Sequence, residues 1–320
     1  MAFFKKINPF SKTNPDTGFG EQANRIGGRF INKDGSFNVQ KTGVSLLNNL
    51  SIYSWLLELS RLKFFIFLLL FFISENIFFT ALYLLAGHGQ LQGFIEQNFW
   101  HKTMEVFFFS TQTFTTVGYG RMNPVGLYGN LIAAFESLTG LLSFAFLTGL
   151  LYGRFTRPKA YISFSTHALI SPFKEGTALM LRMVPYKKRH YLTDAKIAVN
   201  LVIREMEIDK PVYKFFQLKL ERSRVDFFNM NWTIVHPIDE ESPLLNFAET
   251  DLEPSDLELF VQLTGFDPIF SNAVTKRTSY TYKEVIWGAK FNIMYHESED
   301  GDTTILEVDK LDDYEKVVMP

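Results

Sequence analysis

The sequence predicts a membrane protein with two spanning helices, a short re-entrant helix between them, and a β-sandwich domain after them. Three observations lead to this fold class. Of the 32 basic and 34 acidic residues, only six lie between Phe64 and Gly153, so a long apolar region separates two charged flanks. A shorter apolar run stands in the middle of that region. Beyond Pro158 the chain changes to short alternating runs separated by turn residues, as in a β-sandwich.

The first apolar segment, Phe64 to Ala86, covers roughly 35 Å at about 1.5 Å per residue, enough for a hydrocarbon core about 30 Å thick. Glu75 and Asn76 interrupt it, and we expect both to face protein because an exposed charge is costly there. The second segment, Asn130 to Gly153, carries one charge, Glu136. The core of a soluble protein is the alternative for either segment, but two such lengths close together favour membrane helices.

Basic residues set the expected topology. The loop between the helices has only Lys102 and Arg121, whereas both flanks are basic. The positive-inside tendency therefore places the chain in the cell membrane as a multi-pass protein with both termini in the cytoplasm. The basic residues of the flanks are Lys5, Lys6, Lys12, Arg25, Arg29, Lys33, Lys41, Arg61 and Lys63 before the first helix, and Arg154, Arg157 and Lys159 after the second.

The segment from Ser45 to Lys63 has apolar residues at roughly helical spacing. Tyr53 and Trp55 suit the headgroup region, so we expect an amphipathic helix on the inner membrane surface, with packing on a soluble domain as the alternative. The chain then divides into a cytoplasmic N-terminal segment (1–44), an interfacial slide helix (45–60), an outer transmembrane helix (61–86), a long loop (87–129), an inner transmembrane helix (130–157) and the cytoplasmic β domain (158–320). The β-rich runs of that domain are 178–184, 195–207, 213–225, 231–238, 257–266 and 278–295.

The loop 87–129 is too long for a simple hairpin. Its middle, FWHKTMEVFFFSTQTF (99–114), predicts an apolar helix of about four turns, too short to span and typical of a segment that enters the membrane and stops. TTVGYG follows directly. Irregular backbone at membrane depth is tolerated only inside protein or along a water-filled cavity, which argues against an ordinary hairpin turn.

Glycine tolerates positive φ, so Gly118 and Gly120 can alternate with Val117 and Tyr119 and turn successive carbonyls the same way. Several copies around an axis would form stacked oxygen rings that replace the hydration shell of an ion, and the Thr116 hydroxyl would add a ring at the inner end. One chain supplies one wall, so such a site requires an oligomer. The short helix would point its negative C-terminal end at the cavity below and favour a cation there.

TVGYG is itself the filter loop of potassium channels, so its assignment is a resemblance. Most of the chain resembles the inward-rectifier potassium channel family, and its prokaryotic members in particular. The likeness is carried by GRFINKDGSFNVQKTG (28–43), LTGLLYGRFTRPKA (147–160), HPIDEESPL (236–244), VQLTGF (261–266), RTSY (277–280) and EVIWGAKF (284–291). It implies a homotetrameric α-helical membrane pore with a cytoplasmic immunoglobulin-like β-sandwich domain. The loop 87–129 would then be the pore loop, with the pore helix and the selectivity filter.

The resemblance also implies site residues, with K⁺ as the permeant ion and no cofactor. The filter that binds K⁺ would be Thr116, Val117, Gly118, Tyr119 and Gly120. On the inner helix, Phe144, Thr148 and Tyr152 recur every four residues and share one face. By resemblance that face lines the pore, and Phe144 with Tyr152 forms a narrow hydrophobic gate. Packing against lipid or the outer helix is the alternative.

Basic residues at the inner interface would, by resemblance, bind anionic phospholipids, including phosphoinositide. They are Arg61, Lys63, Arg154, Arg157 and Lys159. A plain topology signal is the alternative for any one of them. A second basic cluster, 187–189, either reaches the same surface or lies in a solvated loop. Glu136, a carboxylate within a spanning helix, either acts electrostatically from behind the filter or forms hydrogen bonds with the pore helix, and both roles stay open.

Two residues depart from the family pattern. Gln112 stands where relatives usually have an acid before the filter threonines, and Arg121 stands where many potassium channels have Asp after the filter. The ion pair that braces the filter in relatives is therefore expected to be missing or rearranged. Strongly rectifying members carry a pore-lining acid at the position of Phe144, so block by polyamines or Mg²⁺ is expected to be weaker here. Asp194 and Asp226 are candidates for a cytoplasmic ring of charge instead.

These expectations favour passive, selective K⁺ conduction, gated at the inner-helix crossing by anionic lipid and by movement of the cytoplasmic domain. The rival is a membrane-anchored sensor with a vestigial pore, and K⁺ flux that barium blocks would separate the two. An enzyme is not expected, because the six histidines form no metal-ligand spacing such as H-E-x-x-H. No cysteine is present for a disulfide framework or a cysteine metal site.

Overall fold

The computed structural model describes the chain except for residues 1–6, 15–28, 44–50, 96–97 and 208–209. The chain divides into two compact units. A helical unit comprises Thr42–Arg157, and a β-rich unit brings Met1–Lys41 together with Pro158–Pro320. Residues 45–50 of the predicted slide helix and much of the predicted N-terminal segment lie outside the described residues.

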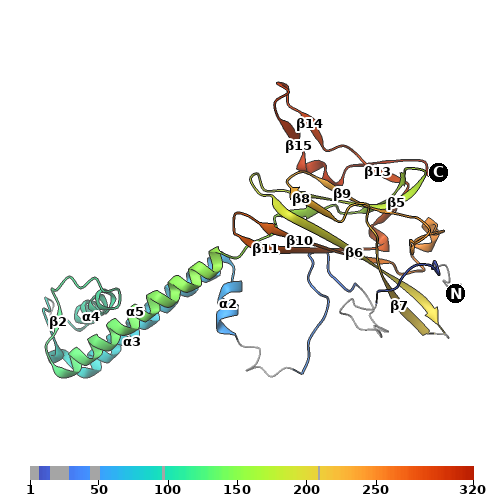
Figure 1. The fold of residues 1–320 in the computed structure, drawn as a ribbon. Coiled ribbons are helices and arrows are strands. Elements are labelled where there is room, and N and C mark those ends of the chain that lie inside the picture. Colours follow the sequence, from blue (N-terminus) through green and yellow to red (C-terminus); the bar gives the residue numbers. More distant parts are fainter. Residues whose placement is uncertain (1–6, 15–28, 44–50, 96–97, 208–209) are drawn as a thin grey trace. The chain divides into compact units, whose positions relative to one another are not determined.

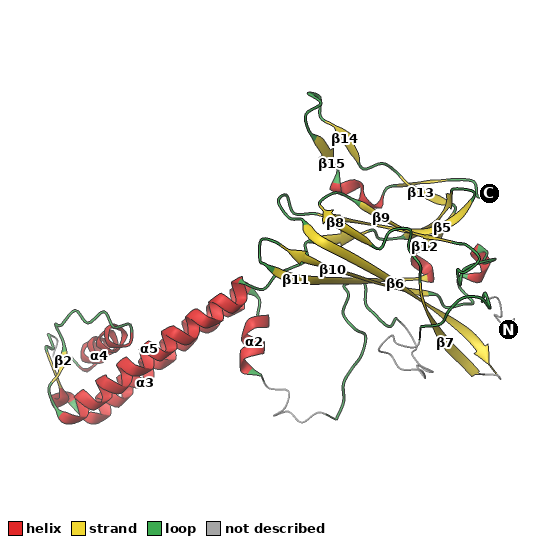
Figure 2. Ribbon diagram, in the orientation of Figure 1, coloured by secondary structure: helices red, strands yellow, loops and turns green. Residues whose placement is uncertain are grey.

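The helical unit consists of a short helix, two long helices and a helix of intermediate length between them. They are α2 (Ile52–Glu58), α3 (Arg61–Ala86), α4 (Phe99–Phe114) and α5 (Leu127–Phe155). Figure 2 shows α3 and α5 side by side, with α4 next to them. By length and composition both long helices are able to cross a membrane. This arrangement confirms the predicted fold class for the membrane part, although α5 begins at Leu127, about one turn earlier than expected.

Local sequence signals set where these helices begin, and aromatic packing holds them together. Ser60 caps α3, since its Oγ accepts a hydrogen bond from the backbone N of Lys63 (3.4 Å). Asn98 caps α4 in the same way through the backbone N of Trp100 (3.0 Å). Side chains of α3 and α4, among them Phe79 and Phe109, are buried together in one apolar cluster.

Two short strands join the segments that flank α4. They are β1 (Leu91–Gln92), which follows the 3₁₀ turn η1 (His88–Gln90), and β2 (Asn123–Pro124), which follows the filter stretch. Leu91 pairs with Pro124 and Gln92 with Asn123 in antiparallel register. The chain before the short helix and the chain after the filter are therefore held together by backbone hydrogen bonds.

The β-rich unit is a sandwich of two five-stranded sheets, visible in Figure 1. The first sheet has the order β11-β10-β6-β7, with β8 also paired to β6, and the second has the order β12-β4-β5-β3, with β9 also paired to β5. The strands of the first sheet are β6 (Leu192–Glu207), β7 (Lys210–Gln217), β8 (Arg224–Phe228), β10 (Glu258–Asp267) and β11 (Asn272–Thr281). Those of the second are β3 (Ile162–Phe164), β4 (Ala168–Phe173), β5 (Gly176–Pro185), β9 (Trp232–Pro237) and β12 (Val285–Trp287).

The core of the sandwich lies between the two sheets, where Leu181 and Met183 of β5 share a buried cluster with Leu201 of β6 and Leu259 of β10. This packing confirms the predicted β-sandwich. The β-rich run 213–225 contains most of β7 and the start of β8, and the run 278–295 is divided among several short elements. Smaller elements complete the unit: η2 (Glu249–Asp251), η3 (Tyr282–Glu284), η4 (Val308–Asp312), β13 (Ala289–Phe291), β14 (Tyr295–Glu297), β15 (Thr304–Leu306) and β16 (Tyr314–Lys316).

Candidate ion-conduction site

The filter stretch begins at the C-terminal end of α4, where backbone hydrogen bonds anchor it. The N–H groups of Val117 and Gly118 both donate to the carbonyl of Gln112, at 2.9 and 3.3 Å. The backbone carbonyl of Gln112 therefore holds the start of the filter. The end of α4 in turn lies close to α5 at Gly140, where an added Cβ would stand 2.0 Å from the carbonyl oxygen of Phe114. A side chain at Gly140 would push the short helix away from α5.

The backbone of the filter stretch alternates in sign of φ. Thr116, Gly118 and Gly120 have φ values of 60, 55 and 83°, whereas Val117 and Tyr119 are outside the left-handed region. A β-branched residue such as Thr116 seldom adopts positive φ, so its backbone is strained. This alternation is the conformation that the sequence predicts for carbonyls that face one side. No atom of the described chain outside the glycines' immediate neighbours lies within 4 Å of a Cβ added at Gly118 or Gly120.

The filter side chains have few partners within one chain. Val117 is 53% exposed and Tyr119 is 80% exposed, high values for apolar side chains. On α5, Phe144 and Tyr152 are likewise exposed, at 73 and 71%. Many other apolar side chains of α3 and α5 are exposed too, so exposure alone does not separate a pore-lining face from one that would contact lipid. Thr148, which lies between the two aromatics, uses its hydroxyl to donate to the carbonyl of Phe144 (2.8 Å).

Glu136 lies at the centre of a buried hydrogen-bond cluster that joins three helices. Its side chain is fully buried. Its Oε2 accepts from the hydroxyl of Tyr83 on α3 (2.7 Å), and its Oε1 accepts from Ser110 Oγ on α4 (2.5 Å). Ser110 Oγ also lies 3.2 Å from Oδ1 of Asn76, which is buried as expected, whereas Glu75 stays partly exposed. The hydrogen bond to the pore helix, one of the two roles left open for Glu136, is thus present in the structure.

Arg121, which directly follows the predicted filter residues, forms an ion pair. Its Nη1 lies 3.1 Å from Oε1 of Glu105, a residue in the first half of α4. The same carboxylate accepts from the backbone N of Ile95, at 3.3 and 3.2 Å to its two oxygens. An ion pair is therefore present next to the predicted filter residues. It is formed by Arg121 and Glu105, and the side chain of Gln112 takes no part in it. The sequence offered no signal for this pairing beyond the unusual residue at 121.

The basic residues predicted to lie at the inner interface divide into two kinds. Arg154 donates from Nη1 to the carbonyl of Leu56 (2.7 Å) and from Nη2 to that of Leu59 (2.8 Å), at the end of α2. Its guanidinium also stands 4.3 Å from the ring centroid of Phe64. Arg154 therefore ties α2 to the long helices, a role that the sequence analysis missed. The side chains of Arg61, Lys63, Arg157 and Lys159 are exposed.

The acidic residues considered for a cytoplasmic ring of charge are both paired with Arg224. Asp194 Oδ1 lies 2.7 Å from Nε of Arg224, and Asp226 lies 3.6 Å from its Nη2. Asp194 also accepts from Nζ of Lys196 (2.9 Å).

In the second basic cluster, Lys187 stands over the ring of Tyr161 at 4.2 Å. Among the described residues no group of three or more His, Asp or Glu is placed to hold a metal ion.

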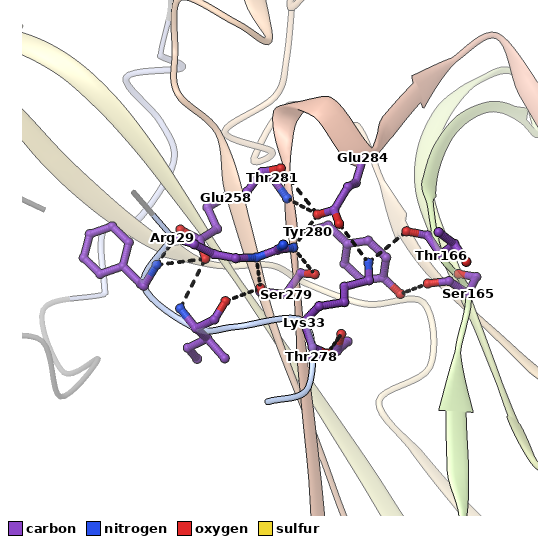
Figure 3. A network of polar contacts seen from close by, with 12 residues as sticks. Arg29, Lys33, Ser165, Thr166, Glu258, Thr278, Ser279, Tyr280, Thr281 and Glu284 are labelled. Carbon is purple, nitrogen blue, oxygen red and sulfur yellow. Dashed lines mark hydrogen bonds and ion pairs between the residues drawn. The ribbon is translucent and has the colours of Figure 1, made fainter. Parts of the chain in front are cut away.

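Within the β-rich unit, a segment near the N-terminus packs against the sheet residues of the region after Pro158, a contact that was not predicted from the sequence. We call residues 29–38 the N-terminal strap, and Figure 3 shows its Arg29 and Lys33 beside Ser279, Tyr280 and Glu284. Arg29 donates to Oγ and O of Ser279 (2.8 and 2.9 Å) and forms an ion pair with Glu284. Lys33 donates to the carbonyl of Thr166 (2.8 Å) and stands over the ring of Tyr280.

The strap is also held by one buried carboxylate. The backbone N of Phe30 and that of Ile31 donate to Glu258, at 3.0 to 3.3 Å. Burial raises the pKa of Glu258 to about 7, although these N–H groups and Arg29 act in the opposite direction. Burial also acts to raise the pKa of Glu284, but the N–H of Thr281 and the two strap cations outweigh it and lower that pKa.

Comparisons with known proteins agree with this geometry. Residues 64–157 match the family described as "Ion channel", and residues 162–320 match the "Inward rectifier potassium channel C-terminal domain". The chain is similar to the inward rectifier potassium channel Kirbac3.1 of Paramagnetospirillum magnetotacticum, with 33% identity over 275 residues, which are 85% of this chain and 91% of that protein.

Two mammalian proteins are similar over a smaller share of their length. Inward rectifier potassium channel 18 of Homo sapiens is 25% identical over 67% of this chain and 51% of its own length. ATP-sensitive inward rectifier potassium channel 12 of Mus musculus is 26% identical over 62% of this chain and 49% of its own length. This chain thus spans about half of each mammalian relative.

Proposed function

The chain belongs to the inward rectifier potassium channel family, and from this premise we propose how it selects K⁺, opens and responds to the membrane. Four chains surround one axis, and residues 116–120 of each supply backbone carbonyls to a filter that holds dehydrated K⁺. The observation that carries this proposal is the alternation of φ at Thr116, Gly118 and Gly120, with open space beside both glycines. The exposed side chains of Val117 and Tyr119 pack against neighbouring copies.

The gate lies on the inner helix. Phe144, Thr148 and Tyr152 of each chain face the axis, and the two rings of aromatic side chains narrow the pore enough to exclude water when the channel is closed. Because the three positions are four residues apart on a continuous helix, they share one face of α5. The gate opens by movement of the inner helices, coupled to the cytoplasmic domain.

Anionic lipid acts at the inner surface of the membrane, and both termini lie in the cytoplasm. Arg61, Lys63, Arg157 and Lys159 have exposed side chains that can reach phosphate groups. Arg154 contributes indirectly, because its guanidinium is committed to the carbonyls of α2. A lipid that draws the neighbouring basic residues to the membrane surface would move α2 and α5 together.

Reconstitution into liposomes tests these proposals. We expect K⁺ uptake that external barium blocks and that changes when phosphoinositide is added. Replacement of Arg61 and Lys63 by Gln should weaken the lipid response and leave barium block intact. A well-folded tetramer that carries no barium-sensitive K⁺ flux would favour a sensor with a vestigial pore. A lipid response that survives removal of all four exposed basic residues would refute the proposed lipid site.

A further inference from the structure

The salt bridge between Arg121 and Glu105 stands directly after the filter. Arg121 is the residue next to Gly120, and its side chain is 48% exposed, whereas that of Glu105 is 12% exposed. Arg121 Nη1 lies 3.1 Å from Oε1 of the carboxylate, and the backbone N of Ile95 lies 3.3 and 3.2 Å from its two oxygens. We call Ile95, Glu105 and Arg121 the outer clasp. It joins the loop before α4, the helix itself and the chain that leaves the filter.

The backbone around Arg121 is fixed as firmly as its side chain. An added Cβ at Gly93 would stand 2.1 Å from the carbonyl oxygen of Arg121, so these two backbones are in close contact. The β1–β2 ladder begins one residue after Met122, which is itself buried. Position 121 therefore has little freedom to move away from the end of the filter, and the direction of its guanidinium depends on the carboxylate at 105.

Four copies of Arg121 would place positive charge at the mouth of a cation pore, which is unfavourable for the entry of cations. In the proposed tetramer each filter strand ends in Arg121, so four guanidinium groups would surround the outer opening. Four uncompensated positive charges at that place repel every K⁺ that arrives. A carboxylate at 3.1 Å from each guanidinium cancels most of this potential at the distance of the ion.

We propose that Glu105 is a positioning residue that neutralises a ring of Arg121 side chains, and that this pair sets how readily K⁺ and divalent blockers reach the outer end of the filter. The inference rests on the proposed tetrameric filter and goes beyond it. It assigns a conduction role to two residues on the outer side of the pore, one of them where many potassium channels have an acid. The charge at the mouth is thus set by an ion pair, which a single substitution can unbalance in either direction.

The test is a set of charge variants measured in planar bilayers. Glu105→Gln preserves the shape of the side chain and an oxygen for the N–H of Ile95, but it leaves Arg121 uncompensated. Arg121→Gln leaves the carboxylate uncompensated, and the double variant Glu105→Gln/Arg121→Gln removes both charges. Lys102→Gln is the matched control. It removes one charge from the same helix, but Lys102 is not next to the filter residues in the chain. The readout is inward unitary K⁺ current at low and high ionic strength, set with an impermeant salt.

We expect Glu105→Gln to lower inward current about eightfold at an ionic strength of about 0.01 M and about threefold at about 0.1 M, for charges roughly 10 Å from the ion. It should also weaken block by external barium. Arg121→Gln should change both quantities in the opposite direction. The double variant should lie closer to the wild type than either single variant, and Lys102→Gln should show less than about a twofold change.

If the outer clasp only stabilises the structure, the variants should give a different set of results. All three clasp variants would then lose current equally at both ionic strengths, and the double variant would be as damaged as the worse single variant. That outcome overturns the inference, and so does a Glu105→Gln current equal to the wild type at low ionic strength. If Glu105→Gln fails to assemble, Arg121→Gln decides, since an unchanged inward current there also overturns it. A wild-type protein without K⁺ current would instead refute the proposed function itself.

Discussion

Replacement of Glu136 tests what the buried carboxylate between the helices does. The side chain accepts hydrogen bonds from Tyr83 and from Ser110, and none of it is exposed. Glu136→Ala removes both acceptors. Ser110 has a second acceptor within reach, Oδ1 of Asn76 at 3.2 Å, so most of the loss falls on the Tyr83 hydroxyl. Glu136→Gln keeps an oxygen for Tyr83 and offers its NH₂ to Ser110 Oγ.

The magnitude follows from the number of groups left without a partner. A buried hydroxyl without an acceptor costs about 1–3 kcal/mol, and side-chain hydrogen bonds in membranes average about 0.6 kcal/mol. We therefore expect Glu136→Ala to destabilise each subunit by about 1–4 kcal/mol. Glu136→Gln should cost less than about 1 kcal/mol, because its partners stay satisfied.

The assay is the thermal stability of the tetramer in detergent, together with K⁺ flux in liposomes. Glu136→Gln should retain both stability and flux if hydrogen bonding is the role of this residue. Tyr83→Phe combined with Glu136→Ala should recover part of the stability that Glu136→Ala loses, because the unpaired hydroxyl is gone. The reasoning is refuted if Glu136→Gln keeps full stability but loses most of the flux, since the charge itself would then serve conduction.

Three further predictions concern the gate, the pore charge and the strap. Tyr152→Ala should raise basal K⁺ flux severalfold in liposomes by widening the inner-helix constriction, and unchanged flux would place the gate elsewhere. Spermine at micromolar concentration should give only shallow block, because Phe144 brings no negative charge to the cavity; steep voltage-dependent block would contradict that assignment. The stability of the folded β-rich unit around the strap should fall as pH rises from about 4.5 to about 7 and stay constant above, because burial in the folded state raises the pKa of Glu258 to about 7 and so favours its protonated form. Hydrogen-exchange protection of the Phe30 and Ile31 amides, corrected for intrinsic rates, should follow this profile in the full-length wild type and lose it in Glu258→Gln; a profile shared by both would exclude Glu258 as its cause.

Features that depend on local pattern were predictable from the sequence. The two spans and the short helix between them follow from the lengths of the apolar runs, and α3 and α4 occupy Arg61–Ala86 and Phe99–Phe114. The positive φ values of Gly118 and Gly120 follow from the spacing of the glycines, whereas that of Thr116 does not. The β-sandwich follows from short alternating runs. Each of these depends on neighbours within a few residues, which periodicity and composition describe.

Contacts between distant segments were not predictable in the same way. Tyr83 meets Glu136 across 53 positions in the chain, and Arg29 meets Ser279 across 250. Neither pair is marked by spacing, since each depends on how whole elements pack. Arg121 was identified as unusual, but its partner depends on the loop that bends back against the end of the filter. Arg154 looked like one more interfacial cation, although it caps the carbonyls of a short helix.

The reversal potential under bi-ionic conditions tests the central claim most directly. The wild-type channel in a planar bilayer would face K⁺ on one side and the same concentration of Na⁺ on the other. If carbonyls of residues 116–120 replace the hydration shell of K⁺, the current should reverse close to the potential expected for a membrane permeable to K⁺ alone. External barium should abolish the current. A reversal potential near zero, with both ions carried equally, would contradict the account.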